Sequence, residues 1–457
     1  MGRLSRLATL LDYVQIPRVR WPFGRCSWIV KNVMVEPAGE RVTFGAVLRV
    51  VEFRALWFAE AMSMAGDQLA RVAVSVLVFN RTGSASLTAL VYALTFLPAI
   101  VGGALLSGLA DRLPRRSLMI ACDLIRAVLL AAMALPDMPL PVVCTLLVGS
   151  VLAGRPFTAA QVAILPEILS GERYVVGTGL RMVTDQVAQL AGFAGGGIAV
   201  ALIGARGGLA VDAATFLLSA IVIRLFVRRR PLTAPPETTA APGRLTVWRQ
   251  IRAATALVLA DRRLRALAGL GWLAGLHVVP EGLAAPYVAD LGGGPVAIGI
   301  LMAALPAGTA VGAIVMVRWP GRVRERLIGP LAVATALPML ACAARPDLAV
   351  SIVLWFATGL FAAYQLPASA AFVRSVPDAH RGQTIGLIGS ALIALQGLGI
   401  VFFGVVADHV GAADAIAIAG IPALVFATSL AWVWARTHPR SKTGVTVDPT
   451  EAAARVP

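Results

Sequence analysis

About twelve apolar stretches, each long enough to cross a lipid bilayer, recur along this chain of 457 residues. A hydrocarbon core of about 30 Å needs roughly 20 apolar residues in a helix. Because backbone polar groups find no water there, each stretch is predicted to be a helix that satisfies its own hydrogen bonds. The stretches lie near residues 55–79, 87–110, 117–135, 141–165, 177–203, 207–227, 264–287, 295–317, 326–344, 349–374, 383–406 and 412–435.

The overall composition agrees with this pattern. Hydrophobic residues make up 58% of the chain, charged residues only 14%, and the mean hydropathy is +0.80. Soluble domains carry about 25% charged residues. We therefore expect an all-α integral membrane protein with twelve transmembrane helices.

The formal net charge of +16 would also suit a nucleic-acid-binding protein, but its distribution argues against that partner. Basic residues gather in every second loop, which is the positive-inside pattern of membrane proteins. It predicts a multi-pass protein of the cell membrane with both termini in the cytoplasm, and a basic face that contacts anionic lipids. These residues are Arg112, Arg115, Arg116, Arg228, Arg229, Arg230, Arg262, Arg263, Arg265, Arg318, Arg322, Arg324, Arg326, Arg374, Arg381, Arg436, Arg440 and Lys442.

A break near residue 230 divides the apolar stretches six and six. Residues 233–243 are rich in Pro, Thr and Ala, as in linkers, and Val247, Ile251, Ala254 and Val258 then recur at helical spacing. This spacing predicts an amphipathic helix on the cytoplasmic membrane face. The predicted organisation is a basic cytoplasmic segment 1–50, a six-helix bundle 51–228, a cytoplasmic linker 229–262, a second six-helix bundle 263–437 and a disordered cytoplasmic tail 438–457.

The first 50 residues allow two interpretations. They are rich in arginine, and Met34 begins a shorter lead-in to the first apolar stretch. Residues 1–33 are therefore either the product of a mis-assigned translation start or a basic arm on the membrane surface.

The loop at residues 107–116, Ser-Gly-Leu-Ala-Asp-Arg-Leu-Pro-Arg-Arg, resembles the loop between helices 2 and 3 of major facilitator superfamily transporters. Its pattern there is G-x-L-A-D-R-x-G-R-R, which Asp111, Arg112, Arg115 and Arg116 match. The resemblance implies two pseudo-symmetric six-helix bundles that work by alternating access. It also implies a gating latch, with Asp111 against the positive N-terminus of helix 11 near residues 383–384. The alternative is that these charges only set the topology.

The fifth stretch carries a glycine pattern at Gly179, Gly192, Gly196 and Gly197. It is similar to the helix-5 signature of drug-proton antiporters, although Phe193 replaces its proline. The resemblance implies export in exchange for protons, and the glycines by themselves predict close helix packing.

Short polar motifs in three other helices resemble the macrolide-efflux and siderophore-exporter branch of the same superfamily. They are Ser-Met-Ala-Gly-Asp at 63–67, Asp-Leu-Ile-Arg at 123–126 and Asp-Ala-Ala-Thr-Phe-Leu-Leu-Ser-Ala at 212–220. The resemblance implies a monomer that moves a drug, a macrolide-like compound or a siderophore. Uptake, lipid flipping and a non-transporting membrane receptor on the same scaffold stay open as alternatives.

Ionisable residues at membrane depth are costly, and so they are functional candidates. Asp67 and Arg71 are four residues apart, and Asp123 and Arg126 are three apart, so each pair is predicted to form an ion pair along one helix face. Arg155 and Asp185 have no such local partner. They are expected either to pair across neighbouring helices or to leave Arg155 free to attract an anionic substrate.

His277 and Glu281 are the candidates for proton coupling. They lie four apart in the seventh stretch and share a face, with Pro280 between them. A carboxyl group in a low-dielectric cavity resists ionisation and can therefore carry a proton. The alternative is that Glu281 lies near the outer surface and is simply solvated.

Other chemistry finds no support in the motifs. The chain carries neither a P-loop nor a dinucleotide-binding glycine pattern, and its four cysteines lack metal-site spacing. We therefore expect no cofactor, no metal and no enzymatic activity, and a small amphipathic or cationic-aromatic molecule as substrate. The expected cavity lining is Phe157, Trp272, Trp355, Phe361, Tyr364 and Gln365.

Overall fold

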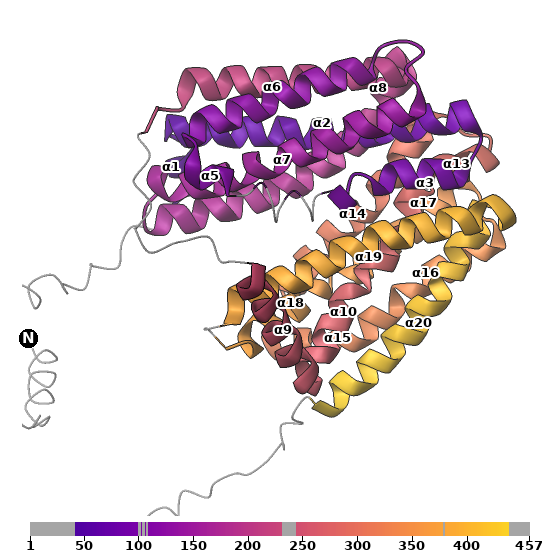
Figure 1. Cartoon of the computed structure of the whole chain (residues 1–457). Helices are drawn as coiled ribbons and strands as arrows, with labels where there is room; N and C mark the ends of the chain where they lie inside the picture. Colours follow the sequence, from indigo (N-terminus) through magenta and orange to yellow (C-terminus); the bar gives the residue numbers. More distant parts are fainter. Residues whose placement is uncertain are drawn as a thin grey trace, which may run out of the picture. The chain divides into compact units, whose positions relative to one another are not determined.

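A computed structural model of the chain describes residues 42–98, 102, 106, 108–230, 244–377 and 380–437. The elements discussed below belong to one compact unit that begins at Thr43. Every regular element in these ranges is a helix (Figure 1), which confirms the predicted all-α class. The predictions for Met34, for the linker residues 231–243 and for the tail 438–457 lie outside the described residues.

The N-terminal half consists of helices of unequal length, the longest of which pack along one another. After the short α1 (Phe44–Leu48) these are α2 (Val51–Thr82), α3 (Ala85–Ala93), α5 (Leu109–Arg112), α6 (Arg115–Met133), α7 (Leu140–Ile168) and α8 (Glu172–Phe226). Helix α2 packs against α8, and α6 packs against both α7 and α8. Ser84 starts α3 as its N-cap, because its hydroxyl accepts a hydrogen bond from the Leu87 N–H at 3.2 Å.

Helix α8 is two membrane passes rather than one. Gly204 has φ 76° and ψ 168° inside it, a conformation that ends a helix and that glycine adopts at little cost. Beyond the bend the chain runs back, so that Gly208 packs against Val200. The two passes correspond to the predicted stretches 177–203 and 207–227.

The C-terminal half begins with a helix that is broken three times. Its pieces are α10 (Arg262–Trp272), α11 (Ala274–His277), α12 (Val279–Gly282) and α13 (Ala284–Asp290), with a bend of 45° before the last piece. Pro280 lies in α12 and lacks the N–H that a continuous helix needs. The predicted seventh stretch is therefore an interrupted helix, and His277 and Glu281 lie on separate pieces.

The rest of the C-terminal half is more regular. It comprises α14 (Pro295–Val317), α15 (Gly321–Ala334), α16 (Ala336–Ala341), the 3₁₀ turn η1 (Cys342–Ala344), α17 (Leu348–Ala362), α18 (Gln365–Ser375), α19 (Arg381–Val410) and α20 (Ala412–Thr437). Helix α20 packs against α10, α15 and α16, and α14 packs against α17. Asp347 caps α17 by accepting from the Val350 N–H at 2.9 Å.

Each of the twelve predicted stretches contains described helix. Eight described helices are long and apolar enough to cross a membrane, and the bent α10–α13 piece makes nine. Helix α8 contributes two passes, α6 lies in the stretch 117–135, and α3 and α5 lie in the stretch 87–110, which is only partly described. Large apolar side chains such as Leu202 (79% exposed) and Val317 (70%) cover the outside, as expected for a surface that contacts lipid.

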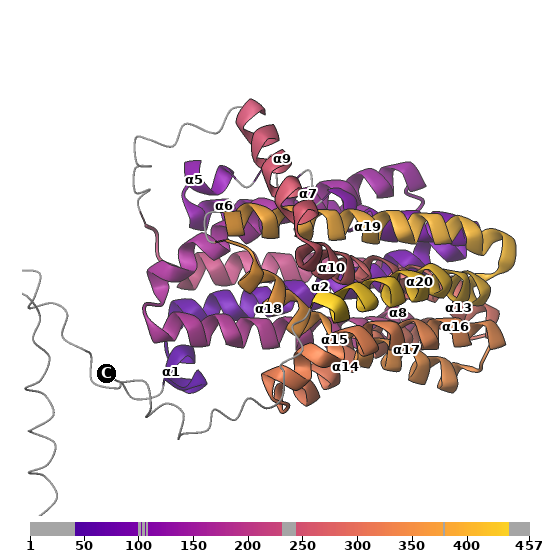
Figure 2. The same ribbon diagram turned by 90° about the horizontal axis from the view of Figure 1, so that it is seen from below.

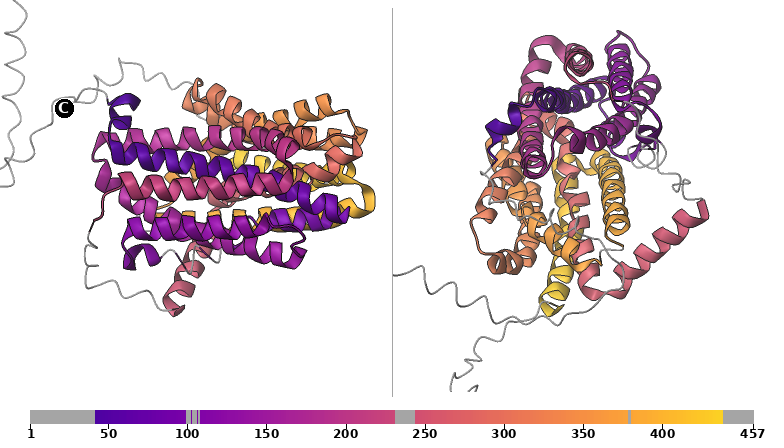
Figure 3. Two further views of the ribbon diagram at one scale, coloured as in Figure 1. Left: turned by 90° about the horizontal axis from the view of Figure 1, so that it is seen from above. Right: turned by 90° about the vertical axis from the view of Figure 1, so that its left-hand side faces the viewer.

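Helix α9 (Arg244–Ala260) lies within the segment predicted to be the linker. It runs obliquely to the long helices (Figures 2 and 3), and it contacts α10 and α19. Two residues of its predicted apolar face, Ala254 and Val258, are buried in the protein. Its contact with the membrane surface and the boundaries of the two bundles at 51–228 and 263–437 stay predictions.

Candidate functional site

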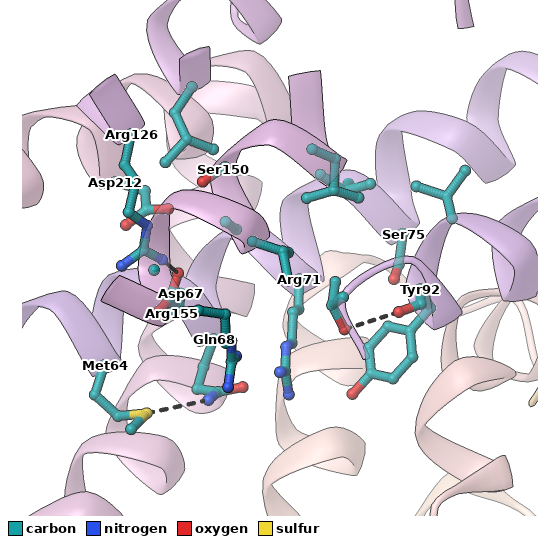
Figure 4. A pocket seen from close by; sticks show the side chains of 18 of the residues that line it. Met64, Asp67, Gln68, Arg71, Ser75, Tyr92, Arg126, Ser150, Arg155 and Asp212 are labelled. Carbon is teal, nitrogen blue, oxygen red and sulfur yellow. Dashed lines mark hydrogen bonds and ion pairs between the residues drawn. The ribbon is translucent and has the colours of Figure 1, made fainter. Parts of the chain in front are cut away.

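A polar cavity of about 330 Å³ opens inside the N-terminal half. It lies between α2, α3, α6, α7 and the second pass of α8, and Figure 4 shows the side chains around it. Two acids, Asp67 and Asp212, and three arginines, Arg71, Arg126 and Arg155, line it. All but Asp212 were among the ionisable residues that the sequence indicated at membrane depth. The cavity brings these four together from α2, α6 and α7.

The ion pairs differ from the predicted ones. Arg126 donates to the carboxylate of Asp67 at 2.5 Å, across from α6 to α2. Asp123, fully buried, instead accepts a hydrogen bond from Ser219 at 2.6 Å. The predictions that Asp67 pairs with Arg71 and Asp123 with Arg126 are therefore wrong. Facing helices in a bundle offer closer partners than a neighbour along the same helix.

Arg126 is the centre of a network that joins the three short motifs. Its guanidinium lies 3.8 Å from the centre of the Phe216 ring, and the electrostatic influence of Asp212 and Asp123 also reaches it. Gly66 fits against Asp212, because a Cβ at this position would come within 2.1 Å of the carboxylate oxygen. The motifs at 63–67, 123–126 and 212–220 thus form one polar core.

Arg155 and Asp185 do not meet. Asp185 lies near the ion pair in which Arg181 donates its Nε to Glu60 at 2.5 Å, a pair that sequence reasoning missed. Arg155 lines the polar cavity instead, and its Nε has no hydrogen-bond partner among the described residues. The spacing of Glu60 and Arg181, 121 residues apart, offered no local signal for their pairing.

A second, mostly apolar cavity of about 580 Å³ lies between the two halves. Arg71, Phe96 and Gln189 line it from the N-terminal half, and pieces of α10–α12, α18 and α19 line it from the other half. Two of the six predicted lining residues, Trp272 and Gln365, belong to it.

Three other predicted lining residues are packed in the core. Phe157 packs among apolar side chains of the N-terminal half, Trp355 lies beside Tyr287, and the Tyr364 hydroxyl donates to the Leu270 carbonyl. Phe361 is not part of the lining of the cavities described above. The aromatic rings of Phe157, Trp355 and Tyr364 fill the interfaces between helices, and a sequence does not distinguish this use of a large ring from a cavity lining.

Glu281 is buried at the junction of the two halves, with 4% exposure. It accepts a hydrogen bond of 2.8 Å from the Tyr92 hydroxyl on α3, and it lines the second cavity. Arg71 lies over the rings of Tyr92 and Phe96, 5.8 and 4.9 Å from their centres. The alternative of a solvated surface glutamate is therefore wrong.

His277 also faces the second cavity and is buried. Its Nε2 lies 2.9 Å from the Thr335 hydroxyl, and its Nδ1 has no hydrogen-bond partner among the described residues. The break between α11 and α12 separates it from Glu281, so the two have different neighbours although they line one cavity.

Asp408, which the sequence did not single out, connects the halves at the end opposite the arginine-rich loops. Near the end of α19, it accepts from the backbone N–H groups of Ala85 and Ser86 at 2.7 and 3.2 Å, and from the Ser84 hydroxyl at 3.2 Å. A carboxylate at the N-terminus of α3 is favoured by the helix dipole. The only sequence signal was an acid near a helix end.

The glycines of the fifth stretch have separate packing partners. A Cβ on Gly192 would come within 2.4 Å of the Ala65 carbonyl oxygen, and one on Gly196 within 2.9 Å of the Leu69 Cα, so both bring α8 close to α2. Gly197 instead meets Gly299 of α14, across the halves. A Cβ on Gly179 would meet no atom within 4 Å, so the role of this glycine in the antiporter signature stays a prediction.

The loop at 107–116 is only partly described. Arg115 bonds to the Glu167 carboxylate and to the Ala163 carbonyl, and Arg116 bonds to the Arg224 carbonyl. Arg112 is exposed at the end of α5. The side chain of Asp111 lies outside the described part, so its latch stays a prediction.

Comparison with known proteins decides the family. A sequence profile of the Major Facilitator Superfamily matches residues 56–280 and again residues 278–455. The chain belongs to the major facilitator superfamily. This superfamily transporter is also 28% identical over 177 residues to YkuC of Bacillus subtilis (strain 168), described as an uncharacterized MFS-type transporter. The match covers 38% of this chain and 41% of YkuC.

Solved structures share the fold of this superfamily member. A mutant of the nucleoside transporter NupG superposes with a TM-score of 0.68 at 14% identity, over 84% of this chain and 99% of NupG. A mutant peptide transporter, POT, in complex with alafosfalin also gives 0.68 at 14% identity, over 87% and 96% of the two chains. At such identities the likeness shows the fold alone. This likeness supports the fold of two six-helix bundles, and the family match makes the chain a multi-pass membrane transporter of this superfamily.

Proposed function

We propose that the protein is a secondary active transporter that exports a small organic molecule in exchange for protons. The substrate class suggested by the short motifs is a drug, a macrolide-like compound or a siderophore. The protein acts as a monomer in the cell membrane, with both termini in the cytoplasm. A single observation carries the proton coupling: a buried acid, Glu281, lies where the two halves meet.

The position of Glu281 suits a proton carrier. Its bond to Tyr92 joins α12 to α3, so separating the halves at this point breaks the bond and changes the surroundings of the carboxyl group. A buried carboxyl is favoured in its neutral form, whereas one exposed to water ionises. Alternating access would then load and release a proton as the halves rock.

Proton movement in proteoliposomes tests this proposal. Adding a transported compound to one side should change the internal pH in the wild type, and Glu281→Gln should abolish the change while the protein still inserts and folds. Glu172→Gln, an exposed acid at the start of α8, is the matched control and should behave as the wild type. Unaltered substrate-driven proton flux in Glu281→Gln would contradict the assignment.

Other functions on the same fold are the alternatives to this proposal. Uptake differs from the proposed export in direction, and lipid flipping differs in the molecule that is moved. Whether intact cells accumulate or exclude a labelled compound distinguishes these functions from export. A non-transporting receptor would bind ligand in proteoliposomes without any proton movement. Export is favoured by the glycine pattern of α8, where Gly192, Gly196 and Gly197 make close contacts.

A further inference from the structure

Arg155 is an unmatched cation in the polar cavity. Arg126 is paired with Asp67, and Arg71 lies over two aromatic rings next to Glu281. Arg155 has neither an ion pair nor a hydrogen bond in the described part of the chain, and its Nε is left without a partner. A guanidinium group near the middle of a membrane helix is costly unless something compensates it.

The neighbours of Arg155 increase this cost. Arg71 and Arg126 both repel it, and only Asp67, already bound to Arg126, attracts it. Arg155 and Arg71 both reach into the cavity in Figure 4. An anion between these two side chains would remove the repulsion and give both guanidinium groups an acceptor. Arginine suits this purpose because its planar fork matches carboxylate, sulfonate and phosphate oxygens.

Neutral polar groups extend the site beyond the arginines. Gln68 and Ser75 line the same cavity and are each 3% exposed. The Ser75 hydroxyl and the Gln68 side-chain oxygen have no hydrogen-bond partner among the described residues. Buried polar atoms are normally hydrogen-bonded, so unpartnered ones beside an unmatched arginine are consistent with a site made for a polar ligand.

Arg71 lines the polar cavity and also the apolar cavity between the halves. A ligand held there by an anionic group can therefore extend its apolar body into the second cavity. We infer that Arg155 and Arg71 bind the anionic group of an amphipathic organic substrate. This inference rests on the proposed transport function and narrows its substrate to amphipathic organic anions, whereas the sequence left an amphipathic or a cationic-aromatic molecule open.

Equilibrium binding to the purified protein in lipid nanodiscs tests the inference. The probes are labelled naphthalene-2-sulfonate and naphthalen-2-ylmethylammonium, which share one apolar body and differ in the sign of charge. Empty nanodiscs supply the background. Saturable binding of the sulfonate, at least tenfold tighter than that of the ammonium compound, is expected. Absence of saturable sulfonate binding, or equal affinity for both, overturns the inference.

Substitutions locate the binding. Arg155→Gln and Arg71→Gln should each weaken sulfonate binding about tenfold or more, because charge-assisted hydrogen bonds are the strong ones. Arg155→Lys keeps the charge and should retain part of the affinity, which separates a binding role from misfolding. Arg206→Gln removes a cation outside both cavities and should bind as the wild type. Unchanged binding in folded Arg155→Gln contradicts the inference.

The binding assay uses no proton gradient and no net transport. A protein that binds the sulfonate through Arg155 but moves no protons would refute the proposed exchange and leave the anion site standing. A protein that moves protons with other substrates but does not bind the sulfonate would refute the anion site and leave the proposed proton exchange standing. The two failures are therefore distinguishable.

Discussion

At the scale of single residues, Arg126 connects three parts of the N-terminal half: α6, α2 and the second pass of α8. It bonds to Asp67 on α2 and lies over Phe216 on the second pass of α8. Arg126 is 8% exposed, so its side of the pair is shielded from water. Removing one member of a buried pair leaves the other charge uncompensated, and this is the costly kind of change.

We expect Arg126→Met to lower the free energy of unfolding by about 3 kcal/mol, at the low end of the range for buried pairs because Asp67 is partly exposed. Arg71→Met removes a cation that has no ion pair in the described residues and should cost clearly less. Thermal unfolding in detergent, followed by tryptophan fluorescence, compares the two. Equal destabilisation would show that the Asp67 pair contributes nothing of its own.

At the scale of elements, α3 and α19 hold the halves together at the end opposite the arginine-rich loops. Asp408 accepts three hydrogen bonds from the first residues of α3, and Gly404 approaches Ala89 closely. The latch predicted for Asp111 has the same form at the other end, a carboxylate at the end of helix 2 and the N-terminus of helix 11. The two contacts would favour opposite conformations.

We expect Asp408→Ala to open the end at which Asp408 lies, because it removes all three accepted bonds. Spin labels at Asp137 and Asp290, one exposed on each half, should move apart on average. Asp111→Asn should shift the same distance distribution the other way. Asp414→Ala is the control, since Asp414 bonds to Arg345 within one half. If the distance distribution in Asp408→Ala matches that of the control, the contact between Asp408 and α3 does not hold this end closed.

Helices α8 and α14 meet through two glycines. A Cβ on Gly197 would come within 2.7 Å of the Pro295 carbonyl oxygen and 2.9 Å of the Gly299 Cα, both backbone atoms that cannot turn aside. We expect Gly197→Ala to reduce the transport rate several-fold by holding the halves apart. Gly195→Ala, where no atom lies within 4 Å, should leave the rate unchanged. Equal transport rates in the two variants would show that transport does not need the close contact between α8 and α14.

At the scale of the whole molecule, the arginine distribution predicts which end faces the cytoplasm. Asp137→Cys should react with a membrane-impermeant maleimide in intact cells, and Arg322→Cys should react only after permeabilisation, in a background without the native cysteines. The reason is that translocating basic loops is unfavourable, so they stay on the cytoplasmic side. Labelling of Arg322→Cys in intact cells would reverse the predicted orientation.

The substrate also belongs to this scale, because the apolar cavity takes its lining from both halves. Arg71 links the polar cavity of the N-terminal half to the apolar cavity between the halves. Neither cavity by itself defines an amphipathic ligand. Their connection through one arginine is what points to an anionic head and an apolar body.

The sequence by itself determined the membrane class, the twelve helices and the family, because these depend on local quantities. Stretch length against bilayer thickness and the motif at 107–116 can be read without knowing how helices pack. The polar residues at membrane depth were also identifiable, since residue type and position within an apolar stretch can be read without knowing the partner. Asp67, Arg71, Arg155 and Glu281 line the cavities, and their roles stay predictions.

Only the tertiary structure decided which of these residues meet. Spacing along one helix predicted that Asp67 pairs with Arg71, whereas the tertiary structure, in which α2 and α6 both pack against α8, paired Asp67 with Arg126 and left Arg155 unmatched. The Tyr92–Glu281 and Asp408–α3 contacts join residues 189 and about 323 positions apart. A hydrogen bond depends on distances of about 3 Å across helices. Such distances follow from the rotation and crossing of whole helices, which no local pattern specifies.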